Sequence, residues 1–510
     1  MWGSLRTLRL FIAINSVVTL AIGNLSAAVA LTKPFLENMV LQRNMMTPIW
    51  GTAAVGEDVT VTFRSKEVTT KTGPDGKWTV KVESGDASAI PLEIVIKGSN
   101  TITIKNVLVG EVWLAGGQSN MEFTMKSIAG PNTDSIKFAD FPNIRLYTQR
   151  DDKGWRPCDT NTVKDFSATG YYFAKNLYQS LKIPIGVISS NVGGTEVERW
   201  MDPATVAATM PGDTDTWHSG LYNQFIKPLI PYGIRGAIWY QGESDAFPDT
   251  RNPHPADVAS KYRQHFGDMI TGWRKVWGQG DFPFYYVQLA NYMALQTVAG
   301  ENSDWAVVRE AQRLTLTVKN TGMAVIIDIG EAGDIHPKNK WDVGKRLALN
   351  ARAQTYKEKD LVYSSPIFRA KEIRGKNVRC TFYGAEGGLK YVGGSKLTGF
   401  ALAGADNKWY FADATLEKDT VVVSSASVPI PLRVRYAWAN NPTCNLYNAA
   451  GLPASPFQTD GEQIPVALAP MRDAAGRLTL RGVKPVGMLP DALGRRPDAV
   501  ISVSGIRLGK

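Results

Sequence analysis

Short runs of alternating apolar and polar residues fill the chain from residue 31 to residue 106. The clearest runs are DVTVTF (58–63), KWTVKV (77–82), PLEIVIKG (91–98) and NTITIKN (100–106). A period of two places the apolar side chains on one face of a β-strand. Turn-forming stretches such as GPDGK separate the runs. We therefore expect a small antiparallel β domain over residues 31–106.

The pattern changes between residues 107 and 360. Compact apolar runs now follow one another, namely EVWLAG, IGVISSN, RGAIWYQG, FYYVQLA and GMAVIIDI. Between them, apolar residues at helical spacing predict helices over 167–181 and 257–277. Alternation of buried strands with helices is typical of a parallel sheet covered by helices on both faces, the α/β class. We therefore expect an α/β domain over residues 107–360.

Alternating runs return after residue 361 as VRCTFYG, KWYFADATL, TVVVSS and LRVRYAW. They predict a second antiparallel β domain over residues 361–460. Residues 461–510 are rich in lysine and arginine and form a tail to which the sequence assigns no role.

The first thirty residues have the features of a signal peptide. Arg6 and Arg9 precede the apolar run LFIAINSVVTLAIG, and Ala28-Val29-Ala30 fits a small-residue cleavage site. The run is short and interrupted for a membrane span. We therefore expect residues 1–30 to be removed on export to the periplasm or the extracellular space, with a retained N-terminal anchor as the alternative. No integral membrane segment is expected after removal.

Charge and cysteine content bear on binding partners and on metal binding. The chain of 510 residues carries a formal net charge of +10, but no run of five or six basic residues, so we expect no nucleic-acid partner. Cys158, Cys380 and Cys444 lie far apart without metal-type spacing, which indicates packing residues. The oligomeric state stays open.

Polar side chains follow four of the predicted strands of the α/β region. These loops are Gly117-Gln118-Ser119-Asn120, Val192-Gly193-Gly194-Thr195, Gln241-Gly242-Glu243-Ser244 and Gly330–Pro337. In an open parallel sheet, ligands bind at the carboxyl ends of the strands. The sequence therefore predicts that the four loops meet in one site.

Histidine content points to one candidate base. The four histidines are His218, His254, His265 and His336, and only His336 lies just beyond a core strand with an acid close by. A serine nucleophile needs such a base. Because the histidines are scattered, we expect no multi-histidine metal site, although a carboxylate site for calcium stays open. The sequence shows no phosphate cradle and no nucleotide fingerprint, and we expect no cofactor.

Four long blocks follow one another along the chain, namely WLAGGQSNMEF, IPIGVISSNVGGTEVERW, LYNQFIKPLIPYGIRGAIWYQGESDA and DIHPKNKWDVGKRLAL. In this order they resemble the SGNH or GDSL-like hydrolases, and more closely the sialate O-acetylesterase family of carbohydrate esterases, within a likeness over residues 33–460. The resemblance implies that residues 107–360 are the catalytic domain. The resemblance implies a flavodoxin-like SGNH-hydrolase core between the N- and C-terminal antiparallel β domains. It also implies an exported serine esterase that removes O-acetyl groups from carbohydrates, sialic acid or acetylated polysaccharide, through an acetyl-enzyme intermediate. A catalytically inactive glycan-binding module on the same fold is the alternative.

The resemblance also implies the roles of individual residues. Ser119 becomes the nucleophile and His336 its base. The oxyanion hole takes the backbone N–H groups of Ser119 and of Gly193 or Gly194, with the Gln241 amide as a further donor.

Four more residues are implied to bind substrate or to support the site, namely Gln118, Asn120, Glu243 and Arg199. Of these, Glu243 is expected to support its loop rather than to catalyse. Arg199 either meets a sialic-acid carboxylate or is a surface cation.

The acid that orients His336 departs from the pattern of the wider superfamily, Asp-x-x-His. Gly333 occupies the usual acid position, and Asp334 lies two residues before the histidine. Residues i and i+2 of an extended segment point the same way, so Asp334 is predicted to reach the imidazole. Asp328, Glu331 or a backbone carbonyl are the alternatives.

Overall fold

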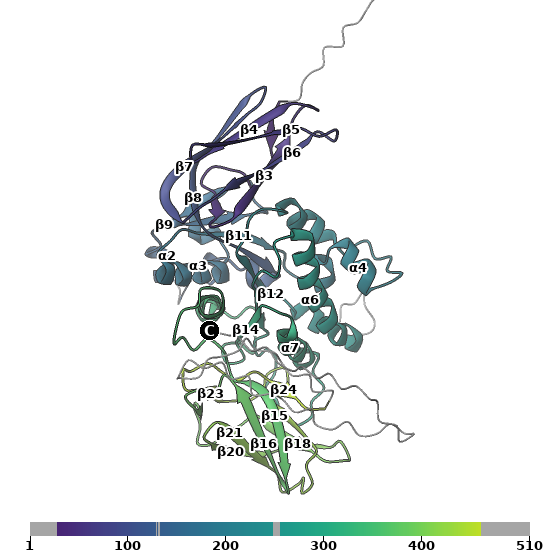
Figure 1. Cartoon of the computed structure of the whole chain (residues 1–510). Coiled ribbons are helices and arrows are strands. Elements are labelled where there is room, and N and C mark those ends of the chain that lie inside the picture. The colour runs from purple at the N-terminus through teal and green to yellow at the C-terminus, as the bar shows by residue number, and fades with distance from the viewer. Residues whose placement is uncertain (1–27, 129, 131–132, 248–254, 461–510) are drawn as a thin grey trace, which may run out of the picture. The chain divides into compact units, whose positions relative to one another are not determined.

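The computed structural model describes residues 28–128, 130, 133–247 and 255–460 (Figure 1). Most of the predicted signal peptide and the whole tail at 461–510 lie outside these residues. The described residues all fall within one compact unit, Met1–Ala467. Within it, Val29 is buried and Ala30 begins the first strand.

The predicted strands of the N-terminal region are present. They are β1 (Ala30–Leu31), β2 (Val40–Gln42), β3 (Met46–Thr52), β4 (Asp58–Phe63), β5 (Lys66–Lys71), β6 (Lys77–Glu83), β7 (Ser88–Lys97) and β8 (Thr101–Gly117). Strands β1, β3 and β6 form one sheet, while β4 pairs with β5 and β7, and β7 pairs with β8. Strict alternation of exposed and buried residues along β6 matches its period-two sequence.

Strand β8 belongs to two sheets. Its first half pairs antiparallel with β7 through Val109, and its second half, from Glu111 to Gly117, pairs parallel with β11. The predicted boundary between residues 106 and 107 therefore falls inside one continuous strand. The division of the chain into domains stays a prediction.

The central sheet has the order β10-β9-β11-β8-β12-β13-β14. Its further strands are β9 (Phe141–Thr148), β10 (Trp155–Cys158), β11 (Ile185–Asn191), β12 (Gly236–Tyr240), β13 (Phe284–Gln288) and β14 (Thr321–Val325). Neighbours from β9 to β14 are parallel, and β10 is antiparallel to β9. Counted from β8 without β9 and β10, the strand order is the flavodoxin-like 2-1-3-4-5. The predicted α/β fold is confirmed.

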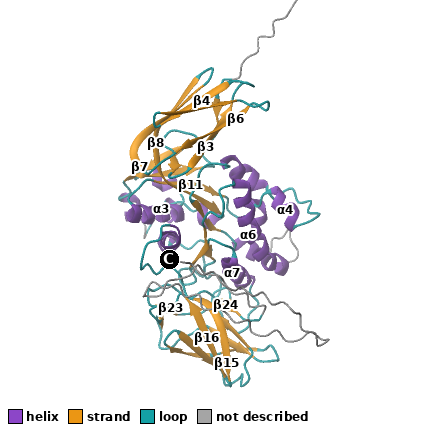
Figure 2. Ribbon diagram, in the orientation of Figure 1, coloured by secondary structure: helices purple, strands orange, loops and turns teal. Residues whose placement is uncertain are grey.

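Helices cover the central sheet. They are α1 (Ser119–Glu122), α2 (Thr133–Lys137), α3 (Ala168–Leu181), α4 (Pro203–Thr209), α5 (Glu243–Ala246), α6 (Pro255–Trp277), α7 (Asp304–Leu314) and α8 (Lys340–Asn350). Figure 2 shows α3 and α6 on opposite sides of the central strands. Ser167 caps α3 by accepting the Gly170 N–H at 3.0 Å. The two predicted helices thus match α3 and α6. No helix within the described ranges is long and apolar enough to cross a membrane.

Short helical turns complete the central region. The 3₁₀ turns are η1 (Lys126–Ile128), η2 (Thr162–Asp165), η3 (Val197–Trp200), η5 (Lys227–Leu229) and η6 (Thr315–Thr317), and η4 (Tyr222–Ile226) and η7 (Ala351–Thr355) are π-helical.

The C-terminal region is antiparallel, as predicted. Its strands are β15 (Ile367–Arg374), β16 (Asn377–Tyr383), β17 (Leu389–Tyr391), β18 (Phe400–Ala403), β19 (Trp409–Phe411), β20 (Asp413–Glu417), β21 (Thr420–Ser424), β22 (Arg433–Tyr436), β23 (Leu446–Asn448) and β24 (Phe457–Gln458). They enclose one apolar core around Phe382, Leu402 and Phe457. Cys158 and Cys380 are buried, Cys444 is partly buried, and all three are free thiols.

A buried carboxylate ties the start of the chain to the central sheet. Glu111 on β8 is fully buried and accepts hydrogen bonds from Arg43 Nε at 2.5 Å, Arg235 Nε at 2.6 Å and Gln42 Nε2 at 3.1 Å. Such a carboxylate is stable in the interior only while its cationic partners remain.

We expect Glu111→Gln to lower the free energy of unfolding by about 3 kcal/mol, because both arginines lose their ionic partner in a buried setting. Urea unfolding monitored by tryptophan fluorescence measures the change. The matched control is Glu372→Gln, which breaks an exposed pair with Arg374 and should cost less than about 1 kcal/mol. Equal effects of the two substitutions would contradict the role of Glu111.

Candidate active site

The close approach of β12 explains the two glycines at the end of β8. Gly117 has φ of 135°, and a Cβ atom there would lie 2.1 Å from the Tyr240 carbonyl oxygen on β12. A Cβ atom on Gly116 would lie 2.9 Å from the Trp239 ring. Only glycine fits at Gly117, since both its backbone angle and the available space exclude a side chain. The chain then turns, and Ser119 begins helix α1.

Ser119 and His336 meet although 217 residues separate them. His336 Nε2 lies 2.9 Å from Ser119 Oγ, within hydrogen-bond distance. The imidazole stacks on Phe123, with ring centroids 4.3 Å apart and an interplanar angle of 15°. Both residues are partly exposed, which leaves the serine hydroxyl accessible. This is the arrangement that a nucleophile and its general base require.

Asp334 lies beside His336 without a hydrogen bond to its ring. Asp334 Oδ1 is 3.7 Å from His336 Nδ1 and accepts the backbone N–H of His336 at 2.8 Å. The alternative acids have other partners in the described chain. Asp328 holds Arg346 through two bonds of 2.6 and 2.8 Å, and Glu331 accepts the Lys338 N–H at 2.8 Å.

A buried charged network lies next to the Ser119–His336 pair. Asn120 Nδ2 donates to Glu243 Oε1 at 2.5 Å and to the Ile335 carbonyl at 2.9 Å. Lys340 Nζ, at the start of α8, donates to Asn120 Oδ1. Glu243 and Lys340 are both buried, and Glu243 Oε2 has no hydrogen-bond partner among the described residues. Glu243 therefore supports the loops that carry Ser119 and His336.

Gly193 lies next to the nucleophile. A Cβ atom on Gly193 would lie 3.2 Å from Ser119 Cβ, and the N–H donates to Glu122 Oε2 at 2.7 Å. The other oxygen of Glu122 accepts from Arg150. Gly194 is exposed and has φ of 68°.

Gln241 is fully buried, and its side chain is occupied inside the protein. Its amide nitrogen donates to the Thr195 carbonyl at 3.0 Å and to Asp245, while its Oε1 accepts from Tyr262 at 3.1 Å. Both amide protons thus have acceptors already. This differs from the expectation of an oxyanion donor: Gln241 joins the loops after β11 and β12 instead.

The side chain of Gln118 joins two loops, because its Oε1 accepts the N–H groups of Gly242 at 3.2 Å and Ser244 at 3.3 Å. The guanidinium of Arg199 lies 5.0 Å from the centre of the Trp217 ring.

The other histidines have their own partners or fall outside the described residues. His218 Nδ1 lies 2.6 Å from Asp213, and the buried His265 lies 2.5 Å from Glu198. His254 lies outside the described residues. No group of three or more His, Cys, Asp or Glu suited to a metal ion occurs within the described ranges.

Burial and Lys340 together lower the pKa of His336 below 6.5, and Asp334 opposes that shift. Burial also lowers the pKa of Lys340 to about 7 and raises that of Glu243. A base with a lowered pKa stays neutral, and so able to accept a proton, in mildly acidic solution. Sequence reasoning missed Lys340 and Glu122, although each is close in sequence to a predicted catalytic residue, four after His336 and three after Ser119.

Comparisons with known proteins show the family to which this chain belongs. The carbohydrate esterase family described as sialic acid-specific acetylesterase matches residues 109–352. Human sialate O-acetylesterase is 28% identical over 82% of this chain and 90% of its own, and the mouse enzyme is 28% identical over 83% and 93%. The crystal structure of a carbohydrate acetylesterase from Xanthomonas citri superimposes with a TM-score of 0.78 and 38% identity, covering 85% of this chain and all of the other.

The parallel α/β sheet, with these comparisons, defines a carboxylic ester hydrolase that acts on carbohydrate acetyl esters. The chain belongs to the sialate O-acetylesterase family of carbohydrate esterases.

We expect Lys340→Met to move the acid limb of the kcat/KM pH profile to higher pH. The positive charge of Lys340 disfavours protonation of His336, so removal of that charge raises the pKa of His336. As the pH falls, the imidazole of the variant is therefore protonated, and activity is lost, at a higher pH than in the wild type. Rates on 4-nitrophenyl acetate from pH 4.5 to 8 measure the shift.

Lys345→Met is the matched control, since Lys345 is an exposed lysine of the same helix. If Lys340→Met folds normally but its acid limb does not move, the electrostatic role of Lys340 is contradicted.

Proposed function

We propose that the protein is an exported serine esterase that removes O-acetyl groups from carbohydrates through Ser119, His336 and Asp334. The observation that carries this proposal is the 2.9 Å contact between Ser119 Oγ and His336 Nε2. Export is supported by Arg6, Arg9 and the apolar run that follows them in the sequence. The acetylated sugar is sialic acid or a unit of an acetylated polysaccharide.

In the first half of the reaction, His336 Nε2 takes the proton of Ser119 as Oγ attacks the acetyl carbonyl. The imidazolium then gives this proton to the departing sugar oxygen, which leaves an acetyl-enzyme. In the second half, His336 activates water to release acetate. The Asp334 carboxylate, 3.7 Å from His336 Nδ1, stabilises the imidazolium by its charge.

The tetrahedral oxyanion needs backbone donors. The Ser119 N–H lies in the first turn of α1, where N–H groups have no partner within the helix. The Gly193 N–H becomes a second donor when Glu122, whose side chain is 38% exposed, moves aside. Donors of this kind each contribute about 2.7–4 kcal/mol to catalysis.

A catalytically inactive glycan-binding module on the same fold is disfavoured. Such a module has no use for a serine hydroxyl at hydrogen-bond distance from an imidazole whose lowered pKa suits a general base.

We expect Ser119→Ala to abolish acetate release without loss of stability, because Ser119 is partly exposed and its known side-chain partner is His336. Acetate release from O-acetyl sialic acid and acetylated xylan, with thermal unfolding alongside, measures both properties. The control Ser425→Ala, at a partly exposed serine of the C-terminal region, should keep full activity. Normal turnover in Ser119→Ala would refute the assignment.

Asp334→Asn should lower kcat about a hundredfold. The full effect of a triad acid is about 10⁴, and the 3.7 Å separation from His336 Nδ1 reduces it. Glu331→Gln keeps an acceptor for the Lys338 N–H and should lower kcat less than threefold. If Asp334→Asn keeps a tenth or more of the activity, Asp334 is not the acid of a triad, and the site is a serine–histidine dyad.

A further inference from the structure

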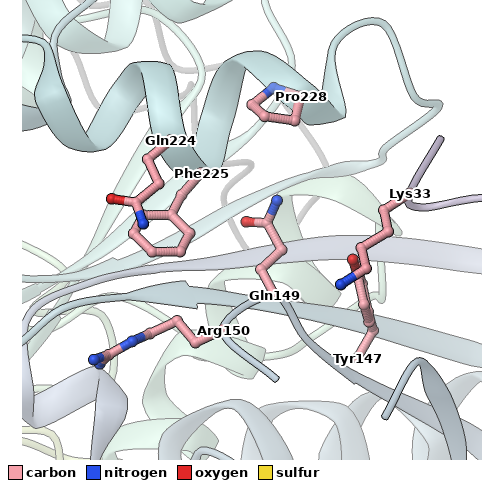
Figure 3. Close-up of a pocket in the computed structure, with 7 residues that line it drawn as sticks. All are labelled: Lys33, Tyr147, Gln149, Arg150, Gln224, Phe225 and Pro228. Carbon is pink, nitrogen blue, oxygen red and sulfur yellow. The ribbon is translucent and has the colours of Figure 1, made fainter. Parts of the chain in front are cut away.

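A polar pocket of about 310 Å³ opens at the carboxyl end of β9 (Figure 3). Tyr147 is the last residue but one of that strand, and Gln149 and Arg150 follow the strand in the next turn. Gln224 and Phe225 of η4 face them across the pocket. Because β9 and β11 are parallel neighbours, this pocket lies at the same edge of the sheet as the loop that carries Gly193.

Two side-chain contacts join the pocket to the catalytic site. Arg150 bonds Glu122, whose other oxygen accepts the Gly193 N–H beside Ser119. Gln149 Oε1 accepts from the Ser190 hydroxyl at 2.5 Å, near the end of β11. Two residues of the pocket wall thus contact the catalytic region directly: Arg150 contacts Glu122, and Gln149 contacts Ser190.

The lining has the chemistry that a sugar ring requires. Gln149 and Gln224 supply amide donors and acceptors, and Phe225 supplies an aromatic surface. The Tyr147 hydroxyl is buried and has no hydrogen-bond partner within the described part of the chain. A buried hydroxyl without a partner is unusual, and a ligand hydroxyl would satisfy it. A pocket of about 310 Å³ has room for one sugar ring.

The charges of the pocket favour a neutral ligand. Its two cations already have anionic partners: Lys33 Nζ lies 2.6 Å from Asp152, and Arg150 is bonded to Glu122. Neither cation is therefore an unpaired charge that calls for an anionic ligand, and the hydroxyl groups of a neutral sugar can be bound by the amides and the phenol.

We propose that this pocket is a subsite for the neutral sugar residue next to the acetylated one, so that the enzyme acts on glycosides in preference to free acetylated monosaccharides. The inference rests on the proposed function, because it takes Ser119 as the nucleophile beside which the acetylated sugar is held. Tyr147 and Gln224 bind the neighbouring sugar by hydrogen bonds, and Phe225 packs against its ring.

The test compares kcat/KM for an acetylated sugar alone and with one neutral neighbour. The probe pairs are O-acetyl sialic acid and its glycoside with lactose, and acetylated xylose and acetylated xylobiose. We expect the wild type to prefer the glycoside of at least one pair about tenfold. Tyr147→Phe and Gln224→Ala should each remove most of that preference.

Both substitutions are designed to leave the fold intact, since the Tyr147 hydroxyl has no hydrogen-bond partner among the described residues and Gln224 is exposed. Thermal unfolding checks this, and Tyr410→Phe, an exposed tyrosine on β19, is the matched control that should keep the full preference.

Each outcome decides a separate point. A preference that is absent in the wild type, or unchanged within twofold in both variants, overturns the subsite while leaving the esterase assignment intact. Hydrolysis of 4-nitrophenyl acetate without acetate release from any carbohydrate overturns the proposed function and the subsite with it. A further probe carries glucuronic acid as the neighbouring sugar. If only this acidic glycoside shows a preference that Tyr147→Phe removes, the neutral assignment is overturned.

Discussion

The close approach of β8 to β12 is the constraint on which the site depends. Gly117 lies so near the Tyr240 carbonyl that no side chain fits, and its φ of 135° turns the chain out of the sheet directly before Ser119. The Gln118 N–H donates to the same carbonyl at 3.0 Å, which fixes the turn. Backbone packing thus sets the position of Ser119, and the loops after β11, β12 and β14 lie around it. This is the switch point at which a flavodoxin-like sheet binds its ligands.

Buried charge is the second feature of the site. Lys340, Asn120 and Glu243 form a chain from α8 to α5, and Asn120 also holds the Ile335 carbonyl next to His336. Buried ions destabilise a fold unless they are paired and hydrogen-bonded. Their position between the loops of Ser119 and His336 suggests a functional reason for this cost: the network fixes the two loops relative to each other and lowers the pKa of the base.

The elements of the fold were largely predictable because their patterns are local. The period-two run at 58–63 became β4, and the helical spacing at 167–181 became α3 with Ser167 as its cap. The apolar run GMAVIIDI outlasts its strand, since β14 ends at Val325 and Asp328 turns away to bind Arg346. Asp334 and Gln241 were harder to judge, because a spacing or a residue type does not reveal which partners a side chain meets.

The sequence by itself determined the α/β class, the four strand-end loops and the choice of Ser119 and His336, since strand period, glycine pairs and a small number of histidines can be read along the chain. Only the tertiary structure decided that Lys340 and Glu122 lie at the site, that Gln241 is committed to Thr195 and Asp245, and that a polar pocket opens beside Arg150. These features depend on contacts between residues far apart in sequence, and such contacts form only when the strands take their order in the sheet.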